Sequence, residues 1–165
     1  MFSSVLRARG DYTIFDSTNV RTGQVGGNQA RSLMAHVISF TTARFDISKE
    51  PANNPNPIAG HSVLEWLRPE LERAGYRTTA PATEDWGWYI DAEGRGGLYL
   101  VGASADATEP ASDVAWTVQV HKHRSLKDKL LGGNKMTNDD PLSTLIERIV
   151  RADTAISAVS VDREE

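Results

Sequence analysis

Three runs in the second half of the chain alternate between apolar and polar residues with a period of two. The clearest extends from Val114 to His121, and two others cover residues 86–90 and 97–102. Side chains alternate between the two faces of a strand, and a short connection rich in glycine, such as residues 92–96, joins antiparallel neighbours. The three runs therefore predict an antiparallel meander of three strands.

The apolar residues of these runs should share one face of the sheet. We expect that inner face to contain Trp86, Trp88, Ile90, Leu98, Leu100, Trp116 and Val118. Aromatic side chains on the inner face of such a sheet usually belong to the core rather than to a pocket. The outer face should then carry Tyr89, Tyr99, Thr117 and Gln119.

Two further segments have the apolar spacing of helices that cover an inner face. Residues 62–74 begin with the S-x-x-E pattern of a capping box, and Pro69 inside the segment predicts a kink or a break. Residues 141–152 carry apolar residues at intervals of three and four, after a capping residue, Asp140. A fourth strand is predicted over residues 36–45.

These elements predict an α+β fold in the form of a two-layer sandwich. A mainly antiparallel sheet of four to five strands would have two main helices packed on one face. We place this single domain at residues 34–165 and expect residues 1–33, which mix short apolar runs with glycine, serine and arginine, to be a poorly ordered or peripheral extension. After Asp153, helix and strand both fit the pattern.

Composition narrows the class of protein. The 165 residues carry a formal net charge of -4, which disfavours a protein that wraps duplex nucleic acid. The chain contains no cysteine, so thiolate nucleophiles, disulfides and cysteine-ligated metals are excluded. No apolar run is long enough to span a bilayer, and no secretory signal is recognisable. We therefore expect a cytoplasmic protein without a membrane partner.

Histidines at two alternate positions suggest one kind of chemistry. His121 and His123 should point outward from the same strand face. Together with Glu84 or Asp85 from a neighbouring strand end, they would form the two-histidine, one-carboxylate ligand set of open catalytic zinc or iron sites. The simpler interpretation is an exposed strand that happens to carry two histidines, because this spacing is not specific for a metal.

The segment that follows is the one basic stretch of an acidic protein. It contains His121, Lys122, Arg124, Lys127, Lys129 and Lys135. Residues 125–131, followed by two glycines, predict one or two helical turns with a cap at each end. Such a patch would dock a phosphate-bearing ligand or an acidic protein, whereas the alternative is a solvated loop and helix.

Other polar groups have equally plain interpretations. The pairs Glu84–Asp85 and Asp139–Asp140 would serve as general acid and base only if their environments separated their pKa values. Otherwise the first is a solvated strand entrance and the second caps a helix. Trp66 lies about one helical step from the leucine stripe of its helix, so it either favours contact with another protein or is buried by a second layer.

The sequence contains no G-x-S-x-G, no phosphate loop and no G-x-G-x-x-G. We therefore expect a non-catalytic binding or regulatory module without a cofactor, whose partner is another protein. The sequence is also compatible with a homo-oligomer. Immunity and antitoxin proteins share this size and charge, by analogy only. The candidate binding residues are His121, His123, Arg124, Lys127, Lys129, Tyr89, Tyr99, Glu84 and Asp85. The alternative is a small metal-dependent hydrolase that uses His121, His123 and a nearby carboxylate.

Overall fold

The structure is a computed structural model that describes residues 35–51, 58–95, 97–105 and 113–163. Every described residue belongs to one compact unit, Leu33–Glu165. The expectation for residues 1–33 therefore lies outside the described residues.

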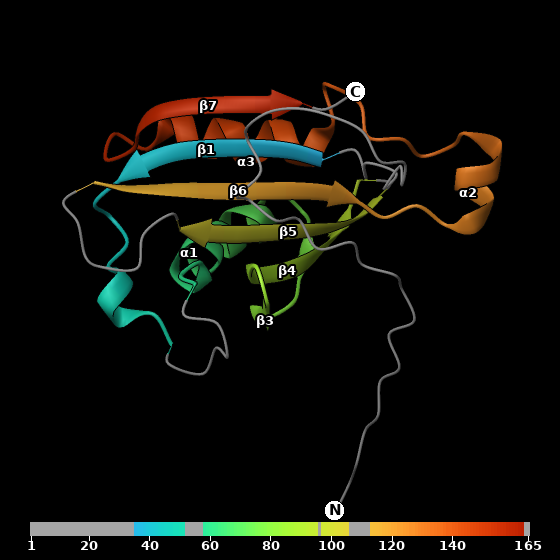
Figure 1. The fold of residues 1–165 in the computed structure, drawn as a ribbon. Helices are drawn as coiled ribbons and strands as arrows, with labels where there is room; N and C mark the ends of the chain where they lie inside the picture. Colours follow the sequence, from blue (N-terminus) through green and yellow to red (C-terminus); the bar gives the residue numbers. More distant parts are fainter. Residues whose placement is uncertain (1–34, 52–57, 96, 106–112, 164–165) are drawn as a thin grey trace, which may run out of the picture. The chain divides into compact units, whose positions relative to one another are not determined.

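The described residues form one antiparallel sheet of seven strands (Figure 1). Its strands are β1 (Ala35–Thr42), β2 (Arg77–Thr78), β3 (Ala82–Glu84), β4 (Gly87–Gly94), β5 (Gly97–Ala105), β6 (Val114–Lys122) and β7 (Ser157–Arg163). The order across the sheet is β2-β4-β5-β6-β1-β7, with β3 also paired to β4. The predicted β4-β5-β6 meander is confirmed. The sheet has more strands than the expected four to five, because β2 and β3 are short and the segment after Asp153 is a strand.

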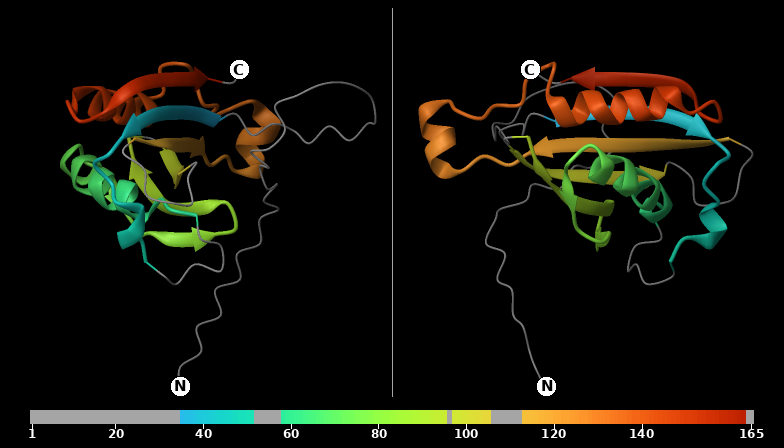
Figure 2. Two further views of the ribbon diagram at one scale, coloured as in Figure 1. Left: turned by 60° about the vertical axis from the view of Figure 1, so that its left-hand side comes forward. Right: turned by 180° about the vertical axis from the view of Figure 1, so that it is seen from behind.

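Two helices, α1 (His61–Arg73) and α3 (Pro141–Ala152), pack on the same face of the sheet (Figure 2). A third, α2 (Leu126–Leu131), lies beyond the sheet's end, and a 3-10 helix, η1 (Ile47–Lys49), follows β1. The α+β class and the two covering helices are thus as predicted. None of the helices in the described part of the chain has the length and apolar character needed to cross a membrane.

The N-terminus of α1 differs from the predicted capping box. A carboxylate from outside the helix, Glu50, accepts hydrogen bonds from the backbone N–H groups of Gly60, His61 and Ser62 at 3.1, 2.9 and 3.0 Å. Glu50 therefore satisfies donors that the first turn of a helix leaves without a partner. A kink or a break was predicted at Pro69, and the helix continues through this residue without a break.

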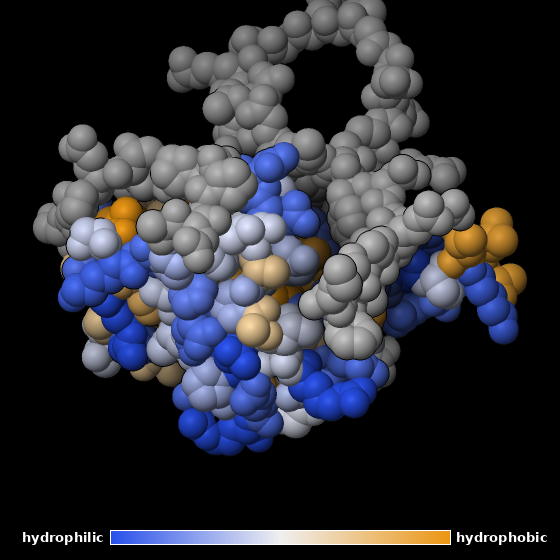
Figure 3. Space-filling view, turned by 90° about the horizontal axis from the view of Figure 1, so that it is seen from below, coloured by the Kyte–Doolittle hydropathy of each residue, from blue (hydrophilic) through white to orange (hydrophobic). Residues whose placement is uncertain are grey.

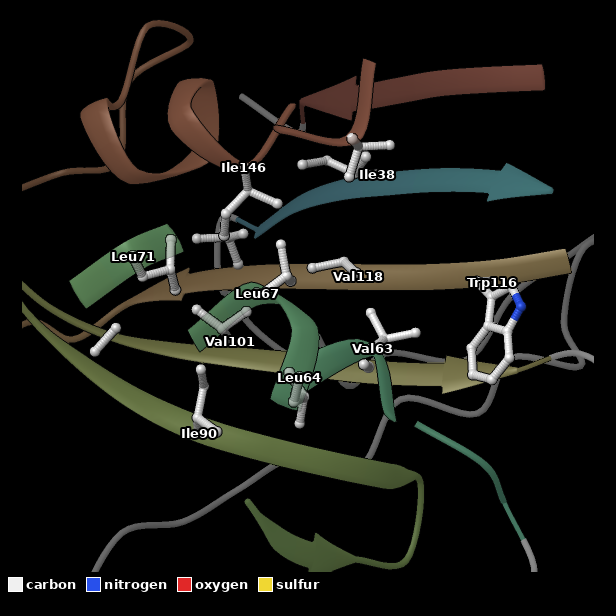
Figure 4. Packing of buried hydrophobic residues seen from close by; sticks show 14 of the residues in the cluster. Ile38, Val63, Leu64, Leu67, Leu71, Ile90, Val101, Trp116, Val118 and Ile146 are labelled. Carbon is white, nitrogen blue, oxygen red and sulfur yellow. The ribbon is translucent and has the colours of Figure 1, made fainter. Parts of the chain in front are cut away.

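The core lies between the sheet and the two helices (Figure 4). Ile38, Ile90, Val101 and Val118 project from four neighbouring strands and meet the helical side chains, among them Leu64, Leu67, Leu71 and Ile146. Trp88 and Trp116 belong to this core, as predicted.

The predicted phase of β5 is wrong by one residue. Tyr99 and Val101 are buried, whereas Leu98 is 44% exposed and Leu100 is half-buried on the outer face. The cause is the register with β4, in which Gly94 is paired with Gly97, so only two residues form the turn. A Cβ at Gly97 would meet the Tyr99 ring at 2.6 Å, so this glycine makes room for the inward tyrosine.

Trp86 also differs from its predicted place on the inner face. It lies in the turn between β3 and β4, and its indole covers Gly102 on the outer face. A Cβ at Gly102 would approach the indole to 2.5 Å, and both neighbours of Gly102 in β5 are buried on the opposite side. The tryptophan therefore contributes to the outer surface of the sheet.

Candidate functional site

The basic stretch of the sequence forms an arm, which we define as residues 123–139, between β6 and α3. It extends beyond the end of the sheet and carries α2 at its tip (Figures 1 and 2). The helix at its tip buries none of its own side chains. The conformation of this tip therefore depends on local hydrogen bonds.

The helix at the tip is closed at both ends. Ser125 Oγ accepts a hydrogen bond from the N–H of Asp128 at 3.1 Å, and Asp128 Oδ2 accepts one from the N–H of Ser125 at 3.1 Å. This reciprocal pair is a capping box. The hydroxyl of Ser125 also donates to Asp128 and is the main reason for the lowered pKa of Asp128. Gly132, with φ of 70°, ends the helix, so the predicted short capped helix is confirmed.

The two ends of the arm are joined by further hydrogen bonds. Arg124 donates from Nε to the carbonyl of Gly133 at 3.0 Å and from Nη2 to that of Asp128 at 2.9 Å. This guanidinium was a predicted binding group, and two of its five N–H donors hold the arm together. Met136 is buried and anchors the returning part of the arm in the core.

At the base of the arm lies a buried ion pair. Lys122 Nζ is 3.3 Å from Asp140 Oδ2, and their side chains are 11% and 1% exposed. The hydroxyl of Tyr99 donates to the same oxygen at 3.2 Å, and Asp140 Oδ1 accepts the N–H of Leu142 at the start of α3. The pair therefore closes the arm at its base and caps a helix at the same time.

Tyr99 was expected on the outer face with the other candidate binding residues, but it is fully buried in this cluster. Burial raises the pKa of its hydroxyl, and the adjacent Asp140 carboxylate raises it further. The ammonium of Lys122 lies 5.3 Å from the centre of its ring. Tyr99 is thus a structural residue that is neutral at ordinary pH.

Three leucines project from α2 into solvent. Leu126, Leu130 and Leu131 are 79%, 86% and 74% exposed. Figure 3 shows a hydrophobic group at the right-hand edge, where α2 lies in Figure 1, beside strongly hydrophilic side chains. Single exposed leucines are ordinary in proteins, but a contiguous apolar group on a projecting helix usually marks an interaction surface.

Two lysines border the stripe formed by Leu126 and Leu130, and Leu131 lies beyond Lys127, about 100° around the helix from Leu130. At 100° per residue, Leu126 and Leu130 lie on one stripe of the helix, with Lys129 on one side and Lys127 on the other. Both lysines are exposed, and among the described residues no carboxylate lies within ion-pair distance of either. We call Leu126, Leu130, Leu131, Lys127 and Lys129 the arm surface.

His121 lies on the predicted strand face, His123 lies one residue beyond the end of the strand, and the predicted carboxylates are elsewhere. His121 lies on the outer face of β6, opposite Leu100 of β5, and His123 follows the strand. Glu84 and Asp85 lie at the β3–β4 turn, where Glu84 is paired with Gly87, several residues along the sheet from His121. In the described ranges, no group of three His, Cys, Asp or Glu is arranged to hold a metal ion.

Another carboxylate is the neighbour of the second histidine. His123 Nε2 lies 4.0 Å from Asp91 Oδ1, which projects from the outer face of β4. Tyr89 lies two residues before Asp91 on the same face, half-buried, as predicted. The outer face therefore gathers some of the predicted residues, with His121 and Tyr89 on the sheet and His123 at the first position of the arm.

A shallow hollow of about 600 Å³ lies between the arm and the β4–β5 turn. Its lining includes Arg95, Leu98, His123, Arg124 and Asn134. It connects two of the predicted binding residues with the exposed Leu98.

The sequence did not predict that the leucines of α2 are exposed. Their spacing and caps identified a short helix, but no signal within six residues shows whether another layer covers them. The inward Lys122 was also missed, although it continues the alternation of Val118 and Val120 and so lies on the inner face.

Comparisons of the chain with protein-family models, with curated proteins and with solved structures found no match.

Proposed function

We propose that this protein is a non-catalytic binding or regulatory module that contacts a protein partner through the arm surface. The observation that carries the proposal is the exposure of three leucines, 74–86%, on one short helix that projects from the domain. Water-exposed leucines at adjacent positions have an unfavourable hydration free energy, and burying one fully contributes about 1.5–3 kcal/mol. A partner that covers all three removes this cost.

The helix is held ready to bind before any partner arrives. Its capping box, its glycine stop and the two hydrogen bonds of Arg124 fix the backbone, and the Lys122–Asp140 pair fixes the base. A segment that is already ordered loses less conformational entropy on binding. The rigid arm therefore supports a role in recognition rather than a role as a solvated connection.

The residues on the arm also indicate the chemistry of the partner. An amphipathic helix binds by laying its apolar stripe in a hydrophobic groove. Lys127 and Lys129 border the stripe, so the complementary groove has carboxylates at its edges, which speed the encounter and fix the orientation. We infer a partner protein with an apolar groove and carboxylates at its edges.

Site-specific photocrosslinking in the native host tests this function. A photoreactive amino acid at Leu130 should capture a discrete protein, whereas one at Lys49, which is 81% exposed on η1, should not. Excess unlabelled wild-type protein should compete, and excess Leu126→Ser/Leu130→Ser should not. Equal capture from both positions, or capture from neither, would contradict the proposal.

A further inference from the structure

A groove between the two covering helices is the second apolar surface of the domain. It has a volume of about 580 Å³ and is lined by residues of α1 and α3 and by their C-terminal ends. Trp66, Leu145 and Ile149 supply an apolar floor that is only partly buried.

The floor of the groove is firmly supported. The ring of Trp66 packs against Phe45 at 5.5 Å, and Phe45 packs edge-on against the buried Trp116 at 5.4 Å. The guanidinium of Arg44 lies 5.4 Å from the centre of the Trp66 indole, and it is fixed by a 2.6 Å ion pair with Asp153. Tryptophan and arginine held in this way are typical of the anchors that dominate binding energy at interfaces.

The size of the groove matches the arm. Leu145 and Ala152 are seven residues apart on α3, which corresponds to about 10 Å along a helix axis. The six residues of α2 extend about 9 Å. The groove is therefore long enough for a third helix of this length, and its apolar floor is complementary to a stripe of leucines.

Long-range electrostatic attraction also favours contact between the arm and the body of the domain that carries the groove. Residues 123–139 contain four lysines or arginines and two aspartates, although the whole chain has a formal net charge of -4. The remainder of the chain is consequently acidic, so the arm of one copy is attracted to the body of another. The rim of the groove carries both signs, Glu70 and Asp153 beside Arg73 and Arg148, so the leucines decide the final contact.

We propose that the arm of one copy of this chain docks in the α1–α3 groove of a second copy. The inference rests on the proposed function and names the partner of the arm. A reciprocal exchange, in which each arm enters the other groove, closes into a dimer with two-fold symmetry. It places Leu126 and Leu130 of each arm in apolar surroundings, so the dimer has two equal contacts.

Light scattering coupled to size-exclusion chromatography, over a series of protein concentrations, tests the dimer. Wild-type protein should have twice the mass of the 18.1 kDa chain. Leu126→Ser/Leu130→Ser, which removes the arm contact, and Ala152→Arg, which fills the groove and repels the lysines, should each give a monomer. Both sites are exposed, so both variants should fold; Ala115→Arg, the same change on the exposed outer face, should remain dimeric.

Mixing the two monomeric variants gives the decisive result. The arm of Ala152→Arg and the groove of Leu126→Ser/Leu130→Ser are both intact, so the mixture should form a heterodimer held by one contact. A chain that carries both changes should remain monomeric in every mixture. A wild-type monomer throughout the concentration series, or a dimer that survives either change, would overturn the inference.

Crosslinking separates this inference from the proposed function. A photoreactive amino acid at Leu130 in a mixture of isotopically light and heavy chains should join the arm of one to α1 or α3 of the other. Capture of a different protein, with no crosslink between copies, would reject the second copy and leave the arm as a binding surface. Capture of neither would reject both.

Discussion

Asp140→Asn isolates the buried charge at the base of the arm. Asparagine has the shape of aspartate and is an equally good helix cap, so the hydrogen bond to the N–H of Leu142 is retained. The change removes the charge that lies 3.3 Å from the Lys122 ammonium. The substitution therefore measures the cost of leaving a nearly buried lysine without its counter-charge.

The expected loss of stability is about 2–3 kcal/mol. Breaking a fully buried pair by removing one partner costs about 3–5 kcal/mol. Lys122 is 11% exposed, and its long side chain allows the ammonium to move toward water, which lowers the cost. Asp140→Ala also removes the cap and should cost about 1 kcal/mol more.

Urea unfolding followed by circular dichroism measures both changes. In the Asp140→Asn background, Lys122→Met removes the unpaired charge and should restore about 2 kcal/mol, which a double-mutant cycle reports as coupling. Stability of Asp140→Asn within about 0.5 kcal/mol of the wild type would show that the pair is solvated and would refute this reasoning.

Three further predictions concern other parts of the fold. Burial, and then the positive charge of Arg163, lower the pKa of His36, so the native state resists a proton that the unfolded state accepts. The free energy of unfolding should therefore decrease as the pH drops below the ordinary histidine pKa of about 6.5. Thermal melts of His36→Gln should show a smaller decrease in stability over the same pH range. Gly60→Ala places a Cβ 2.2 Å from the carbonyl oxygen of Ala103. This clash should lower the free energy of unfolding, measured in urea, by at least about 2 kcal/mol. Glu50→Ala removes the acceptor of three N–H groups of α1 and should cost about 1–2 kcal/mol by the same assay, whereas an unchanged midpoint would mean that water replaces it.

The elements that were predicted correctly are those whose signal is local. The alternation over residues 114–121 and the apolar spacing over residues 141–152 each specify an element and the face that it buries. For α2 the local signal specifies the element alone, because Ser125, Asp128 and Gly132 supply both of its caps within eight residues. Local patterns of this kind are sufficient for the α+β class and the helical layer.

The errors concern positions that partner strands decide. Tyr99 was placed on the outer face because alternation within residues 97–102 fits either phase, and the pairing of Gly94 with Gly97 selects the other one. Trp86 alternates with Trp88 in the sequence, yet β4 begins only at Gly87, so Trp86 belongs to the turn. Each of these outcomes depends on a register that no single segment contains.

The candidate site was predictable in charge but not in exposure. The sequence identified Lys127 and Lys129 as part of a basic patch, and the structure places both on the exposed arm. That the neighbouring leucines have no covering layer depends on where β6 ends and α3 begins, which is a property of the whole fold. Leucine at helical spacing generally predicts core, and α2 departs from that rule.

The most direct test of the arm as a binding surface is quantitative affinity isolation from the native host. Wild-type protein and Leu126→Ser/Leu130→Ser, expressed at equal levels with the same tag, would be compared by mass spectrometry with an isotopically labelled second copy present. The account predicts that one stoichiometric protein, either the labelled copy or another chain, is retained by the wild type and falls at least about tenfold with the variant, which corresponds to about 1.4 kcal/mol. The same proteins in the same amounts with both baits would contradict it.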